Sequence, residues 1–278
     1  MYKIRIKDLN LAQIEDSGQC FRFIKNERPR LNPAEYAEST WQVIAFGRYL
    51  EISQKGKDEF IFSCNQEEFE AIWKDYFDLD TEYSVFKAAV DKKDQFLMNA
   101  VEYGWGIRIL RQDLWEMLVS FIISQRKNIP AIRACVESLC QAYGQPIKAG
   151  DDLVYAFPSA ESLYNVPLEE LKTHSLGYRD KYISRLAKDV VEGSIDLVEL
   201  SKLKPEEATK SLLNIYGVGI KVANCVSLFA LHHIDAFPID VWIQRIIDEE
   251  YEGYFDTSRY AGFAGVIQQY MFYYRRSY

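Results

Sequence analysis

The segment 212–245 constrains what this chain can fold into more than any other part of it. Gly217 and Gly219 bracket Val218 directly after a predicted helix. Two glycines at this spacing permit a tight turn and leave backbone amides unshielded, so an anion can approach the turn closely. The next segment, 220–234, carries apolar residues at helical spacing. The pattern therefore predicts two helices joined by a glycine hairpin that can bind an anion.

Three side chains that can carry chemistry follow this hairpin. Lys221 lies in the first turn of the second helix, where the positive end of the helix dipole disfavours the ammonium form and favours a nucleophilic amine. Cys225 lies four residues further on, so both side chains should face one pocket. Asp240 precedes the helical run 241–247, as an N-cap aspartate does. A nucleophilic amine and a fixed carboxylate at two helix starts form a plausible active site.

The same residues also fit simpler interpretations. A lone Gly-x-Gly-x-Lys string most often marks an ordinary surface turn. A capping role alone would account for Asp240. The residue pattern by itself leaves these alternatives open.

Composition limits the class of protein. The chain has 278 residues, of which 48% are hydrophobic and 27% charged, which is typical of a soluble globular protein with a sizeable core in two or three subdomains. We see no basic-plus-apolar leader and no apolar run of bilayer length, so we expect a cytoplasmic, intracellular protein without membrane contact. The five cysteines lack Cys-x-x-Cys spacing, so neither a disulfide framework nor a zinc site is expected.

The net charge of −8 counts against nucleic acid as a partner, because duplex-binding proteins usually present a basic face. Much of the acidic excess lies in the segment 51–100. Basic clusters at 126–127 and 179–188 can still bind phosphate. The charge therefore weakens a nucleic-acid interpretation without removing it.

Secondary structure should change type once along the chain. The segments 1–6, 41–53 and 59–62 have the alternation or the β-branched and aromatic content of strands, so an N-terminal antiparallel sheet is expected. From Gln66 onwards the pattern is helical, apart from loops, to the end. The expected helices include 67–77, 83–90, 110–125 and 260–278.

Several strings of residues carry a resemblance to a known family. They are SGQ-x-FR from Ser17, then in order RQD, SFIISQ, SLCQAYG, LGYRDKY, LLNIYGVGIKVANCVSLFAL, FPIDVW and AGVIQQYMF, which ends at Phe272. Together they resemble the helix-hairpin-helix DNA glycosylase superfamily, and more closely its 8-oxoguanine DNA glycosylase branch. The resemblance covers nearly the whole chain, and the strings fall in family order.

This resemblance implies an α+β fold. An N-terminal twisted antiparallel β-sheet would be followed by two mainly α-helical subdomains, with a helix-hairpin-helix motif and the active cleft between them. The implied divisions are a sheet domain over 1–83, a helical subdomain made of 84–108 and 215–278, and a second helical subdomain over 109–214.

The resemblance also implies an enzyme, a bifunctional DNA glycosylase and abasic-site lyase of base excision repair. Lys221 would attack C1′ of a flipped nucleotide with help from Asp240, and the resulting Schiff base would allow β-elimination. Gly18 would accept the N7 hydrogen of 8-oxoguanine through its carbonyl. The other residues implied in base recognition are Gln268 at the pairing edge and Phe272 and Cys225 on the two faces.

A third group of residues would act on the DNA around the flipped base. Arg126 stands where the family has an asparagine wedge, and Tyr178 and Arg179 match residues that insert near the orphaned partner base. Ala131 replaces an arginine that reads cytosine, which leads to the hypothesis of relaxed opposite-base selectivity. Trp242 replaces a frequent histidine near the phosphates.

The implied partner is double-stranded DNA containing oxidised guanine, bound by a monomer. Gly217, Val218 and Gly219 would contact phosphate, and no cofactor is expected except a tentative Na⁺ or K⁺ on the carbonyls of Leu213, Ile215 and Val218. An iron-sulfur cluster is not expected, since no cysteine follows Asp240.

Three other functions remain as alternatives. An alkylated-base glycosylase of the 3-methyladenine type would generally lack the lysine. A non-catalytic helix-hairpin-helix module would bind duplex DNA weakly and cleave nothing. An unrelated metabolic enzyme suits the acidic composition, but no phosphate-binding loop or cluster of metal ligands supports it.

Overall fold

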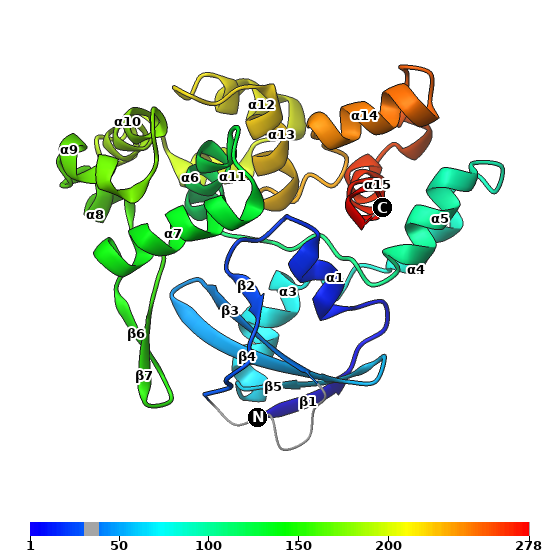
Figure 1. The fold of residues 1–278 in the computed structure, drawn as a ribbon, viewed down its shortest axis with the longest axis horizontal. Coiled ribbons are helices and arrows are strands. Elements are labelled where there is room, and N and C mark those ends of the chain that lie inside the picture. The colour runs from blue at the N-terminus through cyan, green and yellow to red at the C-terminus, as the bar shows by residue number, and fades with distance from the viewer. Residues whose placement is uncertain (31–38, 278) are drawn as a thin grey trace.

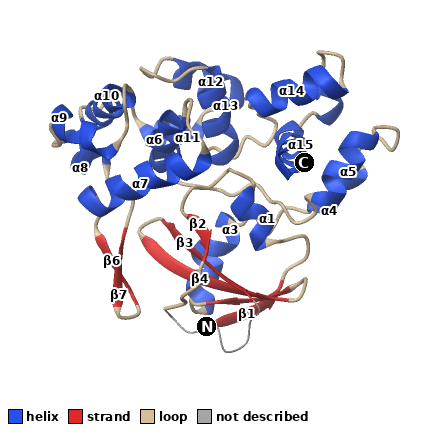
Figure 2. Cartoon of the chain, viewed as in Figure 1, coloured by secondary structure: helices blue, strands red, loops and turns tan. Residues whose placement is uncertain are grey.

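The chain has a sheet at one end and helices at the other, as Figure 2 shows. This structure is a computed structural model, and it describes residues 1–30 and 39–277. The prediction of an α+β fold with an N-terminal antiparallel sheet is confirmed. Within the described residues, no helix is both long enough and apolar enough to cross a membrane.

The main sheet has five antiparallel strands in the order β1-β5-β4-β3-β2. Their bounds are β1 Tyr2–Arg5, β2 Phe23–Lys25, β3 Ser39–Ala45, β4 Arg48–Lys55 and β5 Glu59–Phe62. The expected strand segment 41–53 is a tight hairpin instead, because Phe46 (φ 51°) and Gly47 (φ 70°) both adopt left-handed backbone angles and reverse the chain. Two such residues match the twist of antiparallel strands.

An aromatic helical segment covers this sheet. It consists of α2 Gln66–Glu68, the π-helical turn η2 Phe69–Trp73 and α3 Lys74–Tyr76, so the expected helix contains one wider turn. Phe69, Trp73 and Tyr76 are fully buried against the strands. Phe69 also meets Phe62 of β5, with ring centroids 4.8 Å apart. These contacts hold together a core that belongs to the sheet.

The rest of the chain is mostly helical and shares one large apolar core. Figure 1 shows how its helices are arranged, together with α1, which belongs to the N-terminal part. They are α1 Leu11–Asp16, α4 Tyr83–Ala88, α5 Gln95–Tyr103, α6 Leu114–Ser124, α7 Ile129–Tyr143, α8 Ala160–Tyr164, α9 Leu168–Leu171, η3 Lys172–His174, α10 Arg179–Val191, α11 Leu197–Lys202, α12 Pro205–Leu213, α13 Ile220–Phe229, α14 Val241–Glu250, η4 Thr257–Tyr260 and α15 Ala264–Ser277.

The helical pattern predicted from Gln66 to the end is interrupted by a second sheet, so that prediction is wrong at this point. Strands β6 Pro146–Ala149 and β7 Asp152–Tyr155 form a hairpin that lies against the main sheet. Gly150 (φ 63°) makes the turn. The strands are too short for alternation to distinguish them from a loop. Apolar contacts made far along the chain, with Ile44 and Tyr49, stabilise them.

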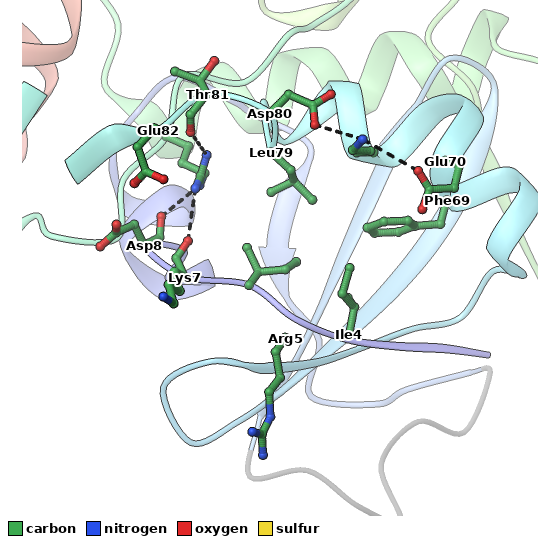
Figure 3. A pocket seen from close by; sticks show the side chains of 13 residues that line it. Ile4, Arg5, Lys7, Asp8, Phe69, Glu70, Leu79, Asp80, Thr81 and Glu82 are labelled. Atoms are coloured by element: carbon green, nitrogen blue, oxygen red, sulfur yellow. Dashed lines mark hydrogen bonds and ion pairs between the residues drawn. The ribbon is translucent and has the colours of Figure 1, made fainter. Parts of the chain in front are cut away.

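A buried arginine joins the sheet to the helical part. The Arg108 guanidinium donates to the carbonyl oxygens of Asp8 (2.9 Å), Lys7 (3.0 Å), Asp78 (2.7 Å) and Thr81 (3.1 Å). Figure 3 shows the carbonyls of Lys7, Asp8 and Thr81 converging beside a cavity of about 270 Å³, which Arg108 also lines. Because the four carbonyls come from two loops, one before α1 and one before α4, Arg108 fixes the position of the N-terminal part relative to the helices that carry the predicted site.

Candidate active site

The glycine hairpin lies between α12 and α13, as predicted. Gly217 adopts φ 91°, and a Cβ atom at this position would come within 2.5 Å of the Tyr182 ring. The carbonyl of Gly217 accepts a hydrogen bond from Gln125 Nε2 at 3.0 Å. Gly219 is the N-cap of α13 and provides no side-chain cap. The free amides at the start of α13 are therefore available to an anion, as expected for a phosphate contact.

Lys221 reaches a cavity of about 600 Å³ from the first turn of α13. Its Nζ lies 5.3 Å from the centroid of the Phe121 ring. Phe121 is held in turn by stacking on Phe229 (5.6 Å) and by an edge contact with Phe21 (5.6 Å). The amine therefore extends over a rigid aromatic wall into the cavity.

Asp240 lines the same cavity from the start of α14. Its Oδ1 accepts hydrogen bonds from the backbone amides of Trp242 and Ile243, each at 2.9 Å, so the predicted N-cap is confirmed. These bonds fix the carboxylate and involve one of its two oxygens. The second oxygen is the one that a substrate can approach.

Two of the residues implied in base recognition meet on the cavity wall. Gly18 adopts φ 75°, and a Cβ atom there would lie 3.1 Å from Phe272 Cε1 and 3.3 Å from Ile129 Cδ1. Gly18 and Phe272 both line the cavity that Lys221 and Asp240 line. Residues from the two ends of the chain therefore come together with the lysine and the aspartate.

The other two lie deeper. Cys225 is 3% exposed and is not among the residues that line the cavity, so the expectation that it shares a pocket wall with Lys221 is not met; burial raises the pKa of its thiol, and the neighbouring Lys221 opposes this rise. Gln268 is 3% exposed and is not among the residues that line the cavity. Its Nε2 donates to the Pro238 carbonyl at 3.0 Å, and its Oε1 accepts from Gln269. The role implied for Gln268 stays a prediction, and it requires the amide to exchange these partners.

The residues implied in filling the strand gap divide into exposed and buried ones. Arg126 is exposed, lines the cavity and adopts φ 53°. Tyr178 is 47% exposed, whereas Arg179 is only 6% exposed. The Arg179 guanidinium donates to the carbonyls of Leu176 (2.9 Å) and Gln125, and lies 4.4 Å from the Tyr178 ring centroid. Arg179 thus supports Tyr178 and the loop before Arg126, and its own insertion stays a prediction.

Two departures from the family pattern lie nearby. Ala131 is in the first turn of α7, where its amide donates to the N-cap Asn128 at 2.9 Å. Trp242 lines the cavity mouth, is 36% exposed, and has the Arg245 guanidinium 5.5 Å from its ring centroid. Ala131 has no side-chain donor where an arginine was expected, whereas the Trp242 indole offers one N–H donor but no acceptor and no charge where a histidine was expected.

Sequence reasoning missed some residues at this site. Phe121 has the same apolar spacing as the core residues of α6, so no signal distinguished it. Gln125 is the last residue of the recognised string SFIISQ, although no role was assigned to it, and Arg276 follows Phe272 by four residues, which was a usable signal. Among the described residues, no group of three or more His, Cys, Asp and Glu side chains is placed to hold a metal ion.

Comparisons with known proteins place this geometry in a family. Residues 1–118 match the model for the N-terminal domain of 8-oxoguanine DNA glycosylase, and residues 119–251 match that for HhH-GPD superfamily base excision DNA repair proteins. The N-glycosylase/DNA lyase of Saccharomyces cerevisiae is 32% identical over 270 residues, which cover 90% of this chain and 70% of the yeast protein.

Solved structures of 8-oxoguanine glycosylases have the same fold as this chain. MBOgg1, described in complex with a low-affinity DNA ligand, superposes with a TM-score of 0.90 at 36% identity, covering 99% of this chain and 95% of the other. The 8-oxoguanine glycosylase/lyase of Clostridium acetobutylicum, in complex with DNA containing cytosine opposite to 8-oxoG, gives 0.88 at 31% identity, covering 98% and 93%. The chain therefore belongs to the 8-oxoguanine DNA glycosylase family of the HhH-GPD base excision repair superfamily.

Proposed function

We propose that this chain excises 8-oxoguanine from double-stranded DNA and then nicks the abasic strand. The observation that carries the proposal is the convergence of Lys221, Asp240, Gly18 and Phe272 on one cavity of about 600 Å³. The fold and family are those of an N-glycosylase/DNA lyase. A cavity of this size accommodates a flipped base, and its entrance carries basic residues that suit DNA phosphates.

Base reading would begin with the Gly18 carbonyl. Guanine N7 is a hydrogen-bond acceptor, whereas the oxidised base carries hydrogen at N7, so a carbonyl in a dry pocket attracts the damaged base and repels the normal one. Phe272 would stack on the base, and the neutral Cys225 thiol would face its other side. Gln268 would read the pairing edge. Such a site discriminates strongly, since the wrong base leaves polar atoms unpaired.

The reaction would start once the nucleotide is flipped, at a cost of a few kcal/mol. The lone pair of Lys221 Nζ attacks C1′, and the bond from C1′ to N9 breaks with its electron pair leaving on the base. Asp240, held by two amides, stabilises positive charge that develops on the sugar. Nζ then loses a proton and the sugar ring opens: the nitrogen lone pair forms the C=N bond of the Schiff base while the C1′–O4′ bond breaks, and O4′ takes up a proton. Removal of a C2′ proton then breaks the bond from C3′ to oxygen and expels the 3′ phosphate.

Arg126 would fill the gap that the flipped base leaves in the damaged strand, while Tyr178 contacts the partner nucleotide on the opposite strand. The flat guanidinium of Arg126 can both stack and donate hydrogen bonds. Ala131 offers no side-chain donor to a partner base. We therefore propose relaxed selectivity for the base opposite the lesion.

The hairpin of Gly217, Val218 and Gly219 would contact phosphate through its backbone amides, and the Val218 amide, which donates to the Ile215 carbonyl at 3.0 Å, would have to exchange that partner. A monovalent cation is compatible with the carbonyls of Leu213, Ile215 and Val218, because Leu213 ends α12 and carbonyls at a helix C-terminus carry partial negative charge. When bound, the cation would supply a positive charge between these oxygens and a DNA phosphate.

We propose that the protein acts as a monomer on chromosomal DNA, which implies an intracellular, nucleoid-associated location.

One assay tests this function. The protein is incubated with duplexes that carry 8-oxoguanine opposite C, A, G or T, and each sample is divided and analysed with and without hot alkali. Strand cleavage without alkali, at comparable rates for the four partners, is the expected result. Cleavage only after alkali would refute the lyase step, and a strong preference for C would refute relaxed selectivity.

A further inference from the structure

Arg276 lies in the last turn of α15, four residues after Phe272 and on the same face of the helix. Although the residue is exposed, its guanidinium is held at two points. Nη1 donates to the carbonyl of Asp16 at 2.7 Å, and Cζ lies 5.4 Å from the centroid of the Phe272 ring. Arg276 also lines the cavity that contains Lys221. One side chain therefore touches both ends of the chain at the proposed site.

The carbonyl that Arg276 binds belongs to the segment that presents Gly18. Asp16 is the last residue of α1, and Ser17 follows as its C-cap. Ser17 Oγ donates to the Ile14 carbonyl at 2.7 Å and accepts from Gln19 Nε2 at 2.9 Å, so the loop on both sides of Gly18 is fixed. A displacement of Asp16 would therefore be transmitted to Gly18.

We infer that Arg276 is a positioning residue for reading the damaged base. It holds the Gly18 loop and the Phe272 ring at a fixed separation, and so sets the width of the part of the cavity that the base must enter. The inference rests on the proposed function, and it assigns Arg276 no contact with the reacting atoms. Its effect should appear in base recognition and leave the chemistry of Lys221 unchanged.

The position of Phe272 makes such a clamp necessary. It lies five residues before the end of α15 at Ser277, and helix ends fray unless other contacts hold them. A hydrogen bond from a guanidinium to a carbonyl is charge-assisted and therefore strong. Without the bond from Arg276 to Asp16, only van der Waals contact would hold Phe272 against the loop of Gly18.

The neighbouring Arg275 provides a matched control. It lies in the same helical turn and carries the same charge, but its guanidinium pairs with Glu249 at the end of α14. Arg275 is not among the residues that line the cavity. Arg275→Ala thus removes one positive charge from the same turn without touching the contacts of Phe272 or Asp16.

The test compares two substrates for the wild type and for Arg276→Ala, Arg276→Lys and Arg275→Ala. One duplex carries 8-oxoguanine opposite C, and the other carries a preformed abasic site that needs Lys221 but presents no base to read. Arg276→Ala should lower single-turnover excision of 8-oxoguanine about tenfold while abasic-site cleavage stays within about twofold. Arg276→Lys, which keeps a donor, should recover part of the loss, and Arg275→Ala should change neither rate.

The ratio of the two rates separates positioning from a merely structural role, because partial unfolding lowers both rates together. Equal losses on both substrates for Arg276→Ala, or no loss on 8-oxoguanine, would overturn the inference. A wild-type protein that cleaves the abasic duplex but not the 8-oxoguanine duplex would refute the proposed function itself, and the role of Arg276 with it. If the wild-type protein cleaves both duplexes, the proposed function stands, and the comparison of the variants then tests only the role of Arg276.

Discussion

Replacing Gly18 with alanine should impair excision of 8-oxoguanine selectively, with little effect on cleavage of a preformed abasic site. Gly18 adopts φ 75°, which costs a residue with a Cβ atom about 1–2 kcal/mol. The new methyl group would lie 3.1 Å from Phe272 Cε1 and 3.3 Å from Ile129 Cδ1, so both side chains must give way by a few tenths of an ångström. We expect the free energy of unfolding to fall by about 2 kcal/mol in total.

The effect on activity follows from the same displacement. A shifted Phe272 ring and a rotated Gly18 carbonyl would weaken the hydrogen bond to N7 and the stacking together. Losing a hydrogen bond of this kind costs about 1.5–3 kcal/mol, which corresponds to a decrease of about tenfold to a hundredfold in the single-turnover excision rate. Cleavage of a preformed abasic duplex should be nearly unchanged. An excision rate for Gly18→Ala within twofold of the wild-type rate, at saturating enzyme, would refute this reasoning.

Three further predictions concern catalysis, the hairpin and pH. Asp240→Asn retains a capping side chain for Trp242 and Ile243, so stability should change by less than about 1 kcal/mol in thermal denaturation, while excision falls about a hundredfold or more; an active variant would contradict the role of the charge. Gly217→Ala would place a Cβ atom 2.5 Å from the Tyr182 ring, so the free energy of unfolding should fall by about 2 kcal/mol. Affinity for duplex DNA, measured by fluorescence anisotropy, should also fall. Unchanged stability and affinity would contradict the packing argument. Burial raises the pKa of Glu116 to about 7, and the nearby Arg22 partly offsets this rise. Because the folded state therefore favours the protonated acid, the free energy of unfolding should fall by about 2 kcal/mol between pH 5.5 and 8. Urea unfolding of Glu116→Gln should show no such fall, and a pH profile identical to that of the wild type would exclude Glu116 as its source.

The features that sequence predicted correctly depend on local chemistry. The capping role of Asp240 needs only the amides that follow it, and Lys221 in the first turn of α13 follows from the glycines before it. The N-terminal strands β1 and β5 were visible in their side-chain patterns. The resemblance of ordered strings added Gly18, Phe272 and Arg126, and the structure places all three on the cavity wall.

The features that sequence did not predict depend on partners far along the chain. Strands β6 and β7 are stabilised by contacts with β3 and β4. The burial of Arg179 follows from the position of the Gln125 carbonyl, 54 residues away. Arg276 meets Asp16 across 260 residues of sequence. No local pattern records such contacts, because the folded backbone alone brings these groups together.

Borohydride trapping tests the central claim most directly. Reduction of the Schiff base should link the wild-type protein covalently to a duplex containing 8-oxoguanine, and mass spectrometry of the digested complex should locate the adduct on Lys221. Lys221→Gln should neither trap nor cleave. A wild-type protein that is not trapped, together with a Lys221→Gln variant that still excises 8-oxoguanine, would contradict the assignment of Lys221 as the nucleophile.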